Sequence, residues 1–150
     1  MTAIRDLLSY RLHLVANLLS RGAELRYRRE FGVSLWEWRT IALLGAATEP
    51  LSLNHLAHAA GIHKSQMSRV VSGLAKRRIA TREPDPGDAR GVRLALSRTG
   101  RRLYDGLISA AAERDAAFRG CLSEREKQVF DRALGKLATQ ARVFIQQEKN

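Results

Sequence analysis

The sequence predicts a mainly α-helical protein with one β-hairpin, and three observations lead to that prediction. Apolar residues recur at spacings of three and four along most of the chain, as they do on one face of a helix. Residues 79–97 instead alternate apolar and polar side chains around turn residues, as a hairpin does. At 150 residues, 45% of them hydrophobic, the chain is long enough for one sizeable domain with its own core.

The charge of the chain limits its partners. It carries 26 lysines and arginines against 15 acidic residues, a formal net charge of +11, which suits a phosphate-coated partner or an anionic membrane surface. No apolar run approaches the roughly 18 residues that span a bilayer, and we find no charged-then-apolar leader. We therefore expect a cytoplasmic protein that does not bind membranes. Its single cysteine, Cys121, cannot form an internal disulfide, which fits a reducing compartment.

Three helices are predicted in the first 61 residues. Ser34 is a predicted N-cap for a helix over 35–46, and Ser52 is one for a short helix that ends at Gly61. A glycine there suits a left-handed turn and makes the connection to the next helix tight. The first helix, over residues 3–29, is expected to bury one apolar stripe, formed by Ile4, Leu7, Leu8, Leu12, Val15, Leu18 and Leu19.

The next segment, HKSQMSRVVSGLAKR at 63–77, has one apolar and one polar side. Its apolar residues Met67, Val70, Val71 and Leu74 have the spacing of a core-facing helical stripe. Two helices joined by a glycine turn, the second with short polar groups facing outward, match a DNA-binding helix-turn-helix. A solvated amphipathic face would give the same pattern, so this helix alone does not decide. The outward residues are Ser65, Gln66, Ser68, Arg69, Ser72 and Lys76.

A basic hairpin directly after that helix favours the DNA-binding interpretation. Residues 76–102 contain nine basic residues against three acidic ones, and Pro84, Pro86 and Gly87 form the predicted turn. Such a hairpin resembles a wing whose tip could place Arg90 in the narrow, negative minor groove. Asp88 would repel phosphate if it were free, so we expect it either to orient an arginine or to cap the turn.

Two further helices are predicted at the C-terminal end. Thr99 begins the first, and Ser123 with Glu126 three residues later is the capping-box pattern that opens the second. Together with the first helix they carry more apolar surface than one small lobe can bury. Association of two copies would bury it, and a monomeric bundle is the alternative.

These residues resemble the MarR family of winged helix-turn-helix transcriptional regulators over nearly the full chain. The resemblance runs from SLWEWRTIALLG at 34–45 through RTGRRL at 98–103, and the Pro-Asp-Pro turn with the Asp88–Arg90 pair is its most diagnostic part. Two positions depart from the family pattern: His63, where Asp or Ser often caps the recognition helix, and Gly73 inside that helix. Each weakens the helix by roughly 1 kcal/mol or less if nothing compensates.

The resemblance implies a homodimer in which residues 1–33 and 99–150 form the dimerisation domain and residues 34–98 form a DNA-binding lobe. It also implies a repressor on a pseudo-palindromic DNA operator, released by a small effector such as an aromatic acid. We expect bases to be read by Ser65, Gln66, Ser68 and Arg69, phosphates to be held by Lys64, Lys76, Arg77, Arg82 and Arg93, and the minor groove to receive Arg90. Rings and cations for an effector pocket are offered by Tyr10, Arg11, His13, Asn17, Trp36, Trp38 and Arg39.

Other functions fit the sequence less well. It has no Gly-rich phosphate loop, no His-Glu-x-x-His and no Ser, His and Asp set with an arguable proximity, so we expect neither an enzyme nor a cofactor. His55, His58 and His63 lack a partner that would complete a metal site, and we expect none. Cys121 could be a redox switch, but we expect it to pack at a helix junction. The alternative function is a sequence-indifferent architectural nucleic-acid binder without effector control.

Overall fold

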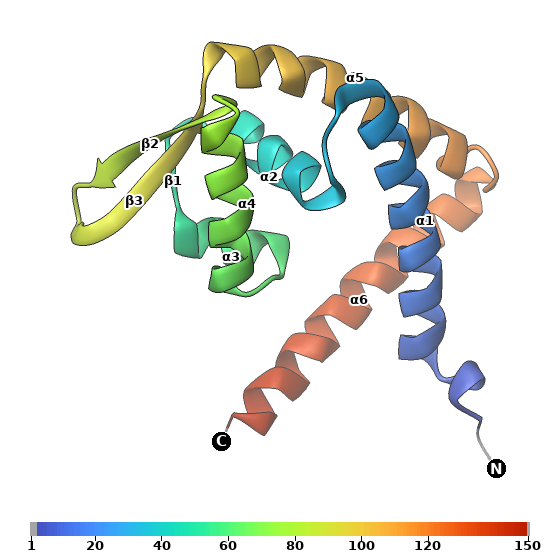
Figure 1. Cartoon of the computed structure of the whole chain (residues 1–150). Helices are drawn as coiled ribbons and strands as arrows, with labels where there is room; N and C mark the ends of the chain where they lie inside the picture. The colour runs from blue at the N-terminus through green and yellow to red at the C-terminus, as the bar shows by residue number, and fades with distance from the viewer. Residues whose placement is uncertain (1–2, 150) are drawn as a thin grey trace. The chain divides into compact units, whose positions relative to one another are not determined.

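The computed structural model describes residues 3–149, which form two compact units that divide at Ala110 and Ala111 (Figure 1). Each unit is described by itself. The chain is helical apart from a small antiparallel sheet, as predicted. In order, the elements are η1 (Ile4–Asp6), α1 (Leu8–Phe31), α2 (Leu35–Ala46), β1 (Leu51–Ser52), α3 (Leu53–Ala60), α4 (Lys64–Lys76), β2 (Ala80–Asp85), β3 (Asp88–Leu96), α5 (Arg98–Arg119) and α6 (Glu124–Glu148).

The first helix differs from its prediction at its start and in its burial. Leu7 is extended, with ψ of 131°, and separates a short 3₁₀ turn from α1, so no single helix begins at residue 3. The predicted buried stripe is wrong for the single chain: Leu18, for example, is 71% exposed. The buried residues of α1 are Ala23 and Tyr27. They lie in its second half, where the Tyr27 ring packs 5.0 Å from the ring of Trp38.

The predicted helix ends around the turn are confirmed. Ser34 Oγ accepts the N–H of Glu37 at 3.2 Å, and the Glu37 carboxylate accepts the N–H of Ser34 at 2.8 Å, a complete capping box for α2. Ser52 caps α3, and Gly61 ends it in the left-handed conformation with φ of 69°. The recognition helix α4 then begins at once, and His63 supplies no side-chain hydrogen bond to its first turn.

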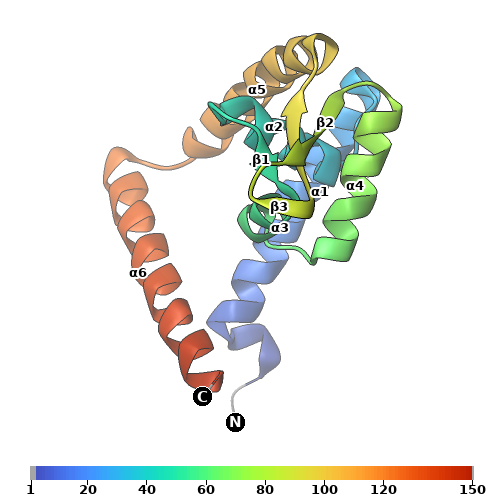
Figure 2. The same ribbon diagram turned by 90° about the vertical axis from the view of Figure 1, so that its left-hand side faces the viewer.

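The predicted hairpin is present, and the structure adds a third strand. Strands β2 and β3 pair antiparallel with a bulge at Pro84/Asp85. Strand β1 pairs with the other edge of β3, with Leu51 opposite Leu94, which gives the sheet order β1-β3-β2. A strand of two residues is too short to show an alternating pattern, so the sequence could not predict it. In Figure 1 the free end of the hairpin extends beyond the helices of the lobe, and in Figure 2 this end faces the viewer.

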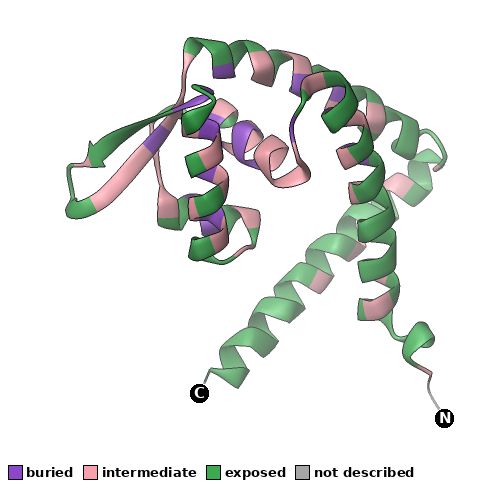
Figure 3. Ribbon diagram, in the orientation of Figure 1, coloured by how far each residue is buried: buried purple, intermediate pink, exposed green. Residues whose placement is uncertain are grey.

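The core of the first unit lies beneath α4. Of the predicted stripe, Met67, Val71 and Leu74 are at most 1% exposed, and Val70 is half-buried. Figure 3 shows buried residues along α2, α3 and α4 and on β3. The other elements of the unit contribute further buried residues to the core, at Val33, Ile41, Leu44, Leu56, Leu94 and Leu107.

Helix α5 begins at Arg98, one residue before the predicted Thr99. Ser97 Oγ accepts the N–H of Gly100 at 3.0 Å, so Ser97 is the capping residue. Gly100 packs so closely on the connection between α4 and β2 that a Cβ on it would overlap the carbonyl oxygen of Ile79. That oxygen already accepts the N–H of Ser97 at 3.0 Å, and the neighbouring carbonyl oxygen of Arg78 accepts the Ser97 hydroxyl at 2.6 Å.

The second unit contains the end of α5 and all of α6. The predicted capping box at its turn is confirmed, because Ser123 and Glu126 exchange hydrogen bonds of 2.7 and 3.2 Å. Arg119 donates to Asp115 and Asp131 at 2.9 and 3.4 Å, and hydrogen bonds to these two carboxylates raise the pKa of its guanidinium. No residue of α6 is buried.

The prediction that Cys121 packs at the junction of the last two helices is wrong for the single chain. Cys121 lies in that junction but is exposed. Its thiol donates to the carbonyl oxygen of Phe118 at 2.9 Å, so the turn and not apolar packing determines its position.

Candidate nucleic-acid interface

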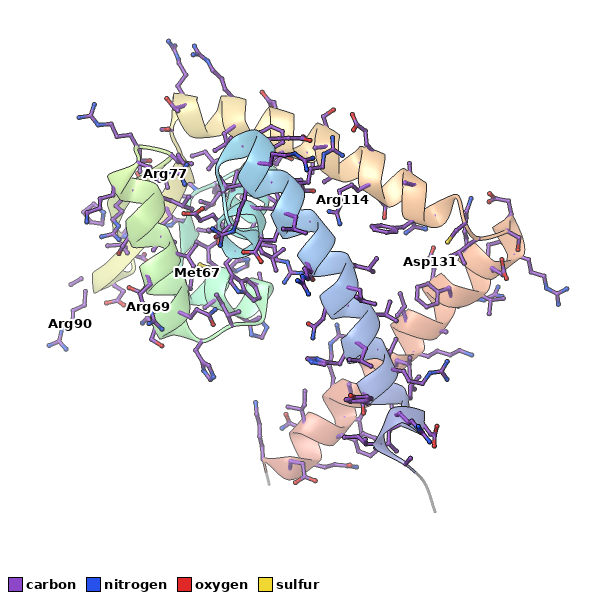
Figure 4. All side chains as sticks on the ribbon, turned by 45° about the vertical axis from the view of Figure 1, so that its right-hand side comes forward. Met67, Arg69, Arg77, Arg90, Arg114 and Asp131 are labelled. Atoms are coloured by element: carbon purple, nitrogen blue, oxygen red, sulfur yellow. The ribbon has the colours of Figure 1, made fainter. Side chains whose placement is uncertain are left out.

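The helix α4 presents one polar face to the outside of the first unit. Ser65 and Arg69 are exposed, and Gln66 and Ser68 are half-buried at the edges of this face. Met67, between them in sequence, is fully buried, so its side chain anchors the helix on the core and fixes which residues face outward (Figure 4). The structure therefore places all four predicted base readers within the first two turns of α4.

The hairpin places Arg90 near its free end. Its side chain is exposed and points away from the lobe in Figure 4. Asp88 Oδ1 accepts the backbone N–H of Arg90 at 3.0 Å, and Asp85 Oδ1 accepts that of Gly87 at 2.9 Å. Of the two alternatives for Asp88, the contact present is the turn cap. The two aspartates hold the backbone of the tip in the way that short acidic side chains hold turns.

The five cations expected at phosphates fall into two groups. Lys64 and Lys76 are exposed, and no salt bridge engages either of them within residues 3–149. The three arginines contact other side chains of the protein. Arg77 lies 3.3 Å from Glu37, Arg82 donates to Ser72 at 2.7 Å, and Arg93 lies 3.9 Å from Glu49.

These contacts orient the arginines and still allow them to bind an anion. A solvent-exposed ion pair contributes about 0–1 kcal/mol, which a phosphate contact can exceed. The Arg77 side chain is 43% exposed, at the end of α4 opposite the glycine turn (Figure 4). Arg93 is the least accessible, at 29%. No local pattern indicates these partners, because Glu37 and Arg77, for example, are 40 residues apart.

The predicted effector residues are only partly brought together. Arg39 stacks 4.9 Å from the ring centroid of Trp36 and donates to Ser20 of α1 at 3.0 Å. Sequence reasoning missed Ser20, although its spacing of three from Asn17 could have indicated a shared face of α1. His13 and Asn17 hydrogen-bond to each other at 3.0 Å, one turn apart on the exposed part of that helix.

A cavity of about 380 Å³ lies between α2 and α3. Trp38 and Arg39 line it together with small residues such as Ala59 and Ala60. The α1 residues of the predicted set do not line it, and neither does Trp36. Trp38 also packs on Tyr27, so part of its ring belongs to the core. Tyr10 is half-buried and Arg11 is exposed, and neither lines this cavity.

Residues 3–149 form neither a metal site nor a membrane-spanning helix. Within that range, no group of three or more His, Cys, Asp or Glu side chains is arranged to hold a metal ion. None of its helices is long and apolar enough to cross a membrane.

Comparisons with known proteins place the fold. Residues 31–91 match the model of the MarR family. A MarR/EmrR family transcriptional regulator from Acinetobacter sp. ADP1 is 25% identical, with a TM-score of 0.84 over 93% of this chain and 98% of the other. The S. aureus MepR–DNA complex is 21% identical, with a TM-score of 0.82 over 89% of this chain and 98% of the other. A MarR family regulator from Rhodococcus sp. RHA1 is 20% identical, with a TM-score of 0.78 over 92% of this chain and 96% of the other.

A search of curated protein sequences found no match. Members of the MarR family are transcription regulators and not enzymes. Residues 31–91 thus carry the sequence pattern of the MarR family, and the chain as a whole has the fold of the MarR-family winged-helix transcriptional regulators.

Proposed function

We propose that this protein is a homodimeric repressor that binds a pseudo-palindromic DNA operator and is released by a small aromatic acid. The observation that carries the DNA-binding part is the exposed polar face of α4 next to a projecting hairpin with Arg90 near its tip. Such a helix fits the major groove, and an arginine at a wing tip fits the minor groove. The matching fold of MepR, solved as a complex with DNA, supports this assignment.

The proposed roles follow the exposure of each side chain. Ser65, Gln66, Ser68 and Arg69 read base edges from the first two turns of α4. Asp88 structures the wing by capping its turn, and Arg90 enters the minor groove. The phosphates are held by Lys64, Lys76, Arg77, Arg82 and Arg93.

The distribution of exposed apolar residues supports a homodimer. Among the described residues, every exposed large hydrophobic side chain lies at positions 4–25 or 108–145, and the lobe at 34–98 has none. Exposed apolar surface of this extent on a soluble chain marks an interface, and a second copy offers an identical surface. Phe144 at 58% and Leu18 at 71% exposure are examples from the two ends of the chain.

The effector is proposed to bind in the cavity lined by Trp38 and Arg39. An indole ring and a guanidinium beside small alanines suit an aromatic carboxylate, which would stack on the ring and pair with the cation. A DNA-bound regulator of this kind works in the cytoplasm.

Selection of bound duplexes from a random pool tests the proposal. We expect a two-fold symmetric sequence to be enriched and aromatic acids to release it. Arg69→Ala should cost about 1–3 kcal/mol on the selected duplex and much less on unrelated DNA, because a bidentate contact to guanine discriminates between bases. Arg90→Ala should also weaken operator binding. Lys149→Ala, which is exposed and lies outside the proposed dimer interface, is the matched control.

The same measurements separate the alternative function. A sequence-indifferent architectural binder would show equally steep salt dependence on all duplexes and no enriched sequence. Equal losses of affinity for Arg69→Ala on selected and random DNA would contradict its base-reading role. A protein that sediments as a monomer at micromolar concentration would contradict the dimer.

A further inference from the structure

An open cleft lies between α4 and strand β2. It has a volume of about 590 Å³; six residues of α4 line one side and Arg82 of β2 lines the other. Ser68, Ser72 and Lys76 follow one another at helical spacing along the α4 side. Three of the lining side chains, Arg69, Lys76 and Arg82, are cations, and none of the described residues that line the cleft is a carboxylate. The cleft therefore favours an anion.

Arg82 is held at this cleft by one short hydrogen bond. Its Nη2 donates to Ser72 Oγ at 2.7 Å, which connects the hairpin to the recognition helix. A guanidinium has five N–H donors, so this bond leaves other donors for a ligand. The Ser72 hydroxyl accepts this bond and still has its own proton to donate. Arg82 is thus oriented before any ligand arrives, and its charge is not neutralised by a lining carboxylate.

The position of the cleft indicates which anion it takes. In the proposed function, α4 enters the major groove and the hairpin reaches the adjacent minor groove. A sugar-phosphate backbone separates these two grooves, so one DNA strand has to cross the surface where α4 and β2 meet. Phosphate oxygens are the groups that this strand presents there, since its bases point toward the duplex interior.

We propose that this cleft binds a backbone phosphate of the operator, with Arg82 as the contacting cation and Ser72 as the residue that positions it. The inference rests on the proposed DNA binding and adds Ser72, to which the sequence assigned no role beyond the outward face of α4.

A salt series on the selected duplex and on an unrelated duplex tests the cleft, with affinity read by fluorescence anisotropy. The slope of log affinity against log salt is negative, and Arg82→Gln should make it less steep by about 0.9, the value for one phosphate contact. It should weaken binding to both duplexes by the same factor, roughly tenfold. Ser72→Ala should weaken binding by roughly threefold with the slope unchanged, because it removes no charge. The double variant should bind about as Arg82→Gln does, since Ser72 acts through Arg82.

Lys149→Gln, which is exposed and lies outside the proposed dimer interface, is the control for the change in net charge. If Arg82→Gln matches this control in slope and affinity, the proposal is overturned. A loss confined to the selected duplex also overturns it, because Arg82 would then read a base. If Arg82→Gln lacks the wild-type helical circular dichroism, Arg82→Lys replaces it. This variant keeps the charge, so it should bind more weakly than the wild type but with the wild-type slope. Wild-type affinity in both Arg82→Lys and Ser72→Ala would overturn the proposal. Failure of the wild type to prefer any duplex refutes the proposed function itself.

Discussion

Replacing Gly100 by alanine should destabilise the protein, although alanine is the better helix former. Gly100 lies in the first turn of α5, and a Cβ on it would overlap the carbonyl oxygen of Ile79 in the backbone between α4 and β2. A backbone carbonyl oxygen cannot rotate away as the end of a flexible side chain can. The first turn of α5 therefore has to move away from the lobe, together with the Ser97 contacts that join the two.

The magnitude follows from three contributions. Ile79 O accepts the N–H of Ser97 at 3.0 Å, and Arg78 O accepts the Ser97 hydroxyl at 2.6 Å; losing both hydrogen bonds costs about 2 kcal/mol. Overpacking at a close contact costs about 1–3 kcal/mol more. Alanine regains about 1 kcal/mol of helix propensity. The net loss is about 2–4 kcal/mol, a fall of roughly 5–15 °C in melting temperature for a chain of this size.

Gly73→Ala is the matched control, because Gly73 also lies inside a helix of the first unit. A Cβ there would lie 3.9 Å from Glu37 Oε1, an ordinary contact. We expect this variant to be about 0.5–1 kcal/mol more stable than the wild type. Urea unfolding at one fixed protein concentration measures both, since the stability of an oligomer depends on concentration. If Gly100→Ala proves as stable as Gly73→Ala, the proposed packing of α5 on the lobe is refuted.

Three further predictions concern single side chains. Arg78 is the one described non-glycine residue with positive φ, 57°, so Arg78→Gly should gain about 1 kcal/mol in urea unfolding, and Arg78→Ala should gain nothing. Glu37→Gln keeps an acceptor for the Ser34 N–H and loses only the ion pair with Arg77, so it should lower the free energy of unfolding by under about 1 kcal/mol. Glu37→Ala should lower it further, because α2 also loses this part of its capping box. Hydrogen bonds from the backbone and side chain of Ser123 lower the pKa of Glu126, so this carboxylate stabilises the fold above its ordinary pKa and loses that effect as pH falls through the lowered value. The difference in melting temperature between wild type and Glu126→Gln should accordingly shrink from neutral to acid pH, and a constant difference would contradict the capping role.

The sequence by itself determined the features that depend on neighbours within one or two helical turns. Ser34, Ser52 and Ser123 cap their helices through N–H groups three residues away, as their spacing predicted. Gly61 takes the left-handed conformation because its missing side chain removes the steric cost. The apolar stripe of α4 faces the core for the same local reason, since the helical period alone sets its direction.

Only the tertiary structure decided the contacts between residues far apart in sequence. Strand β1 exists because Leu51 meets Leu94 across the sheet. The arginines at the candidate interface are oriented by partners such as Ser72 for Arg82, which no local pattern indicates. Composition and periodicity indicate which face of an element is apolar. Which residues pack on that face depends on how folding brings distant segments of the chain into contact. Long-range contacts therefore depend on the tertiary structure, whereas helix caps, turns and the helical period follow from the local sequence.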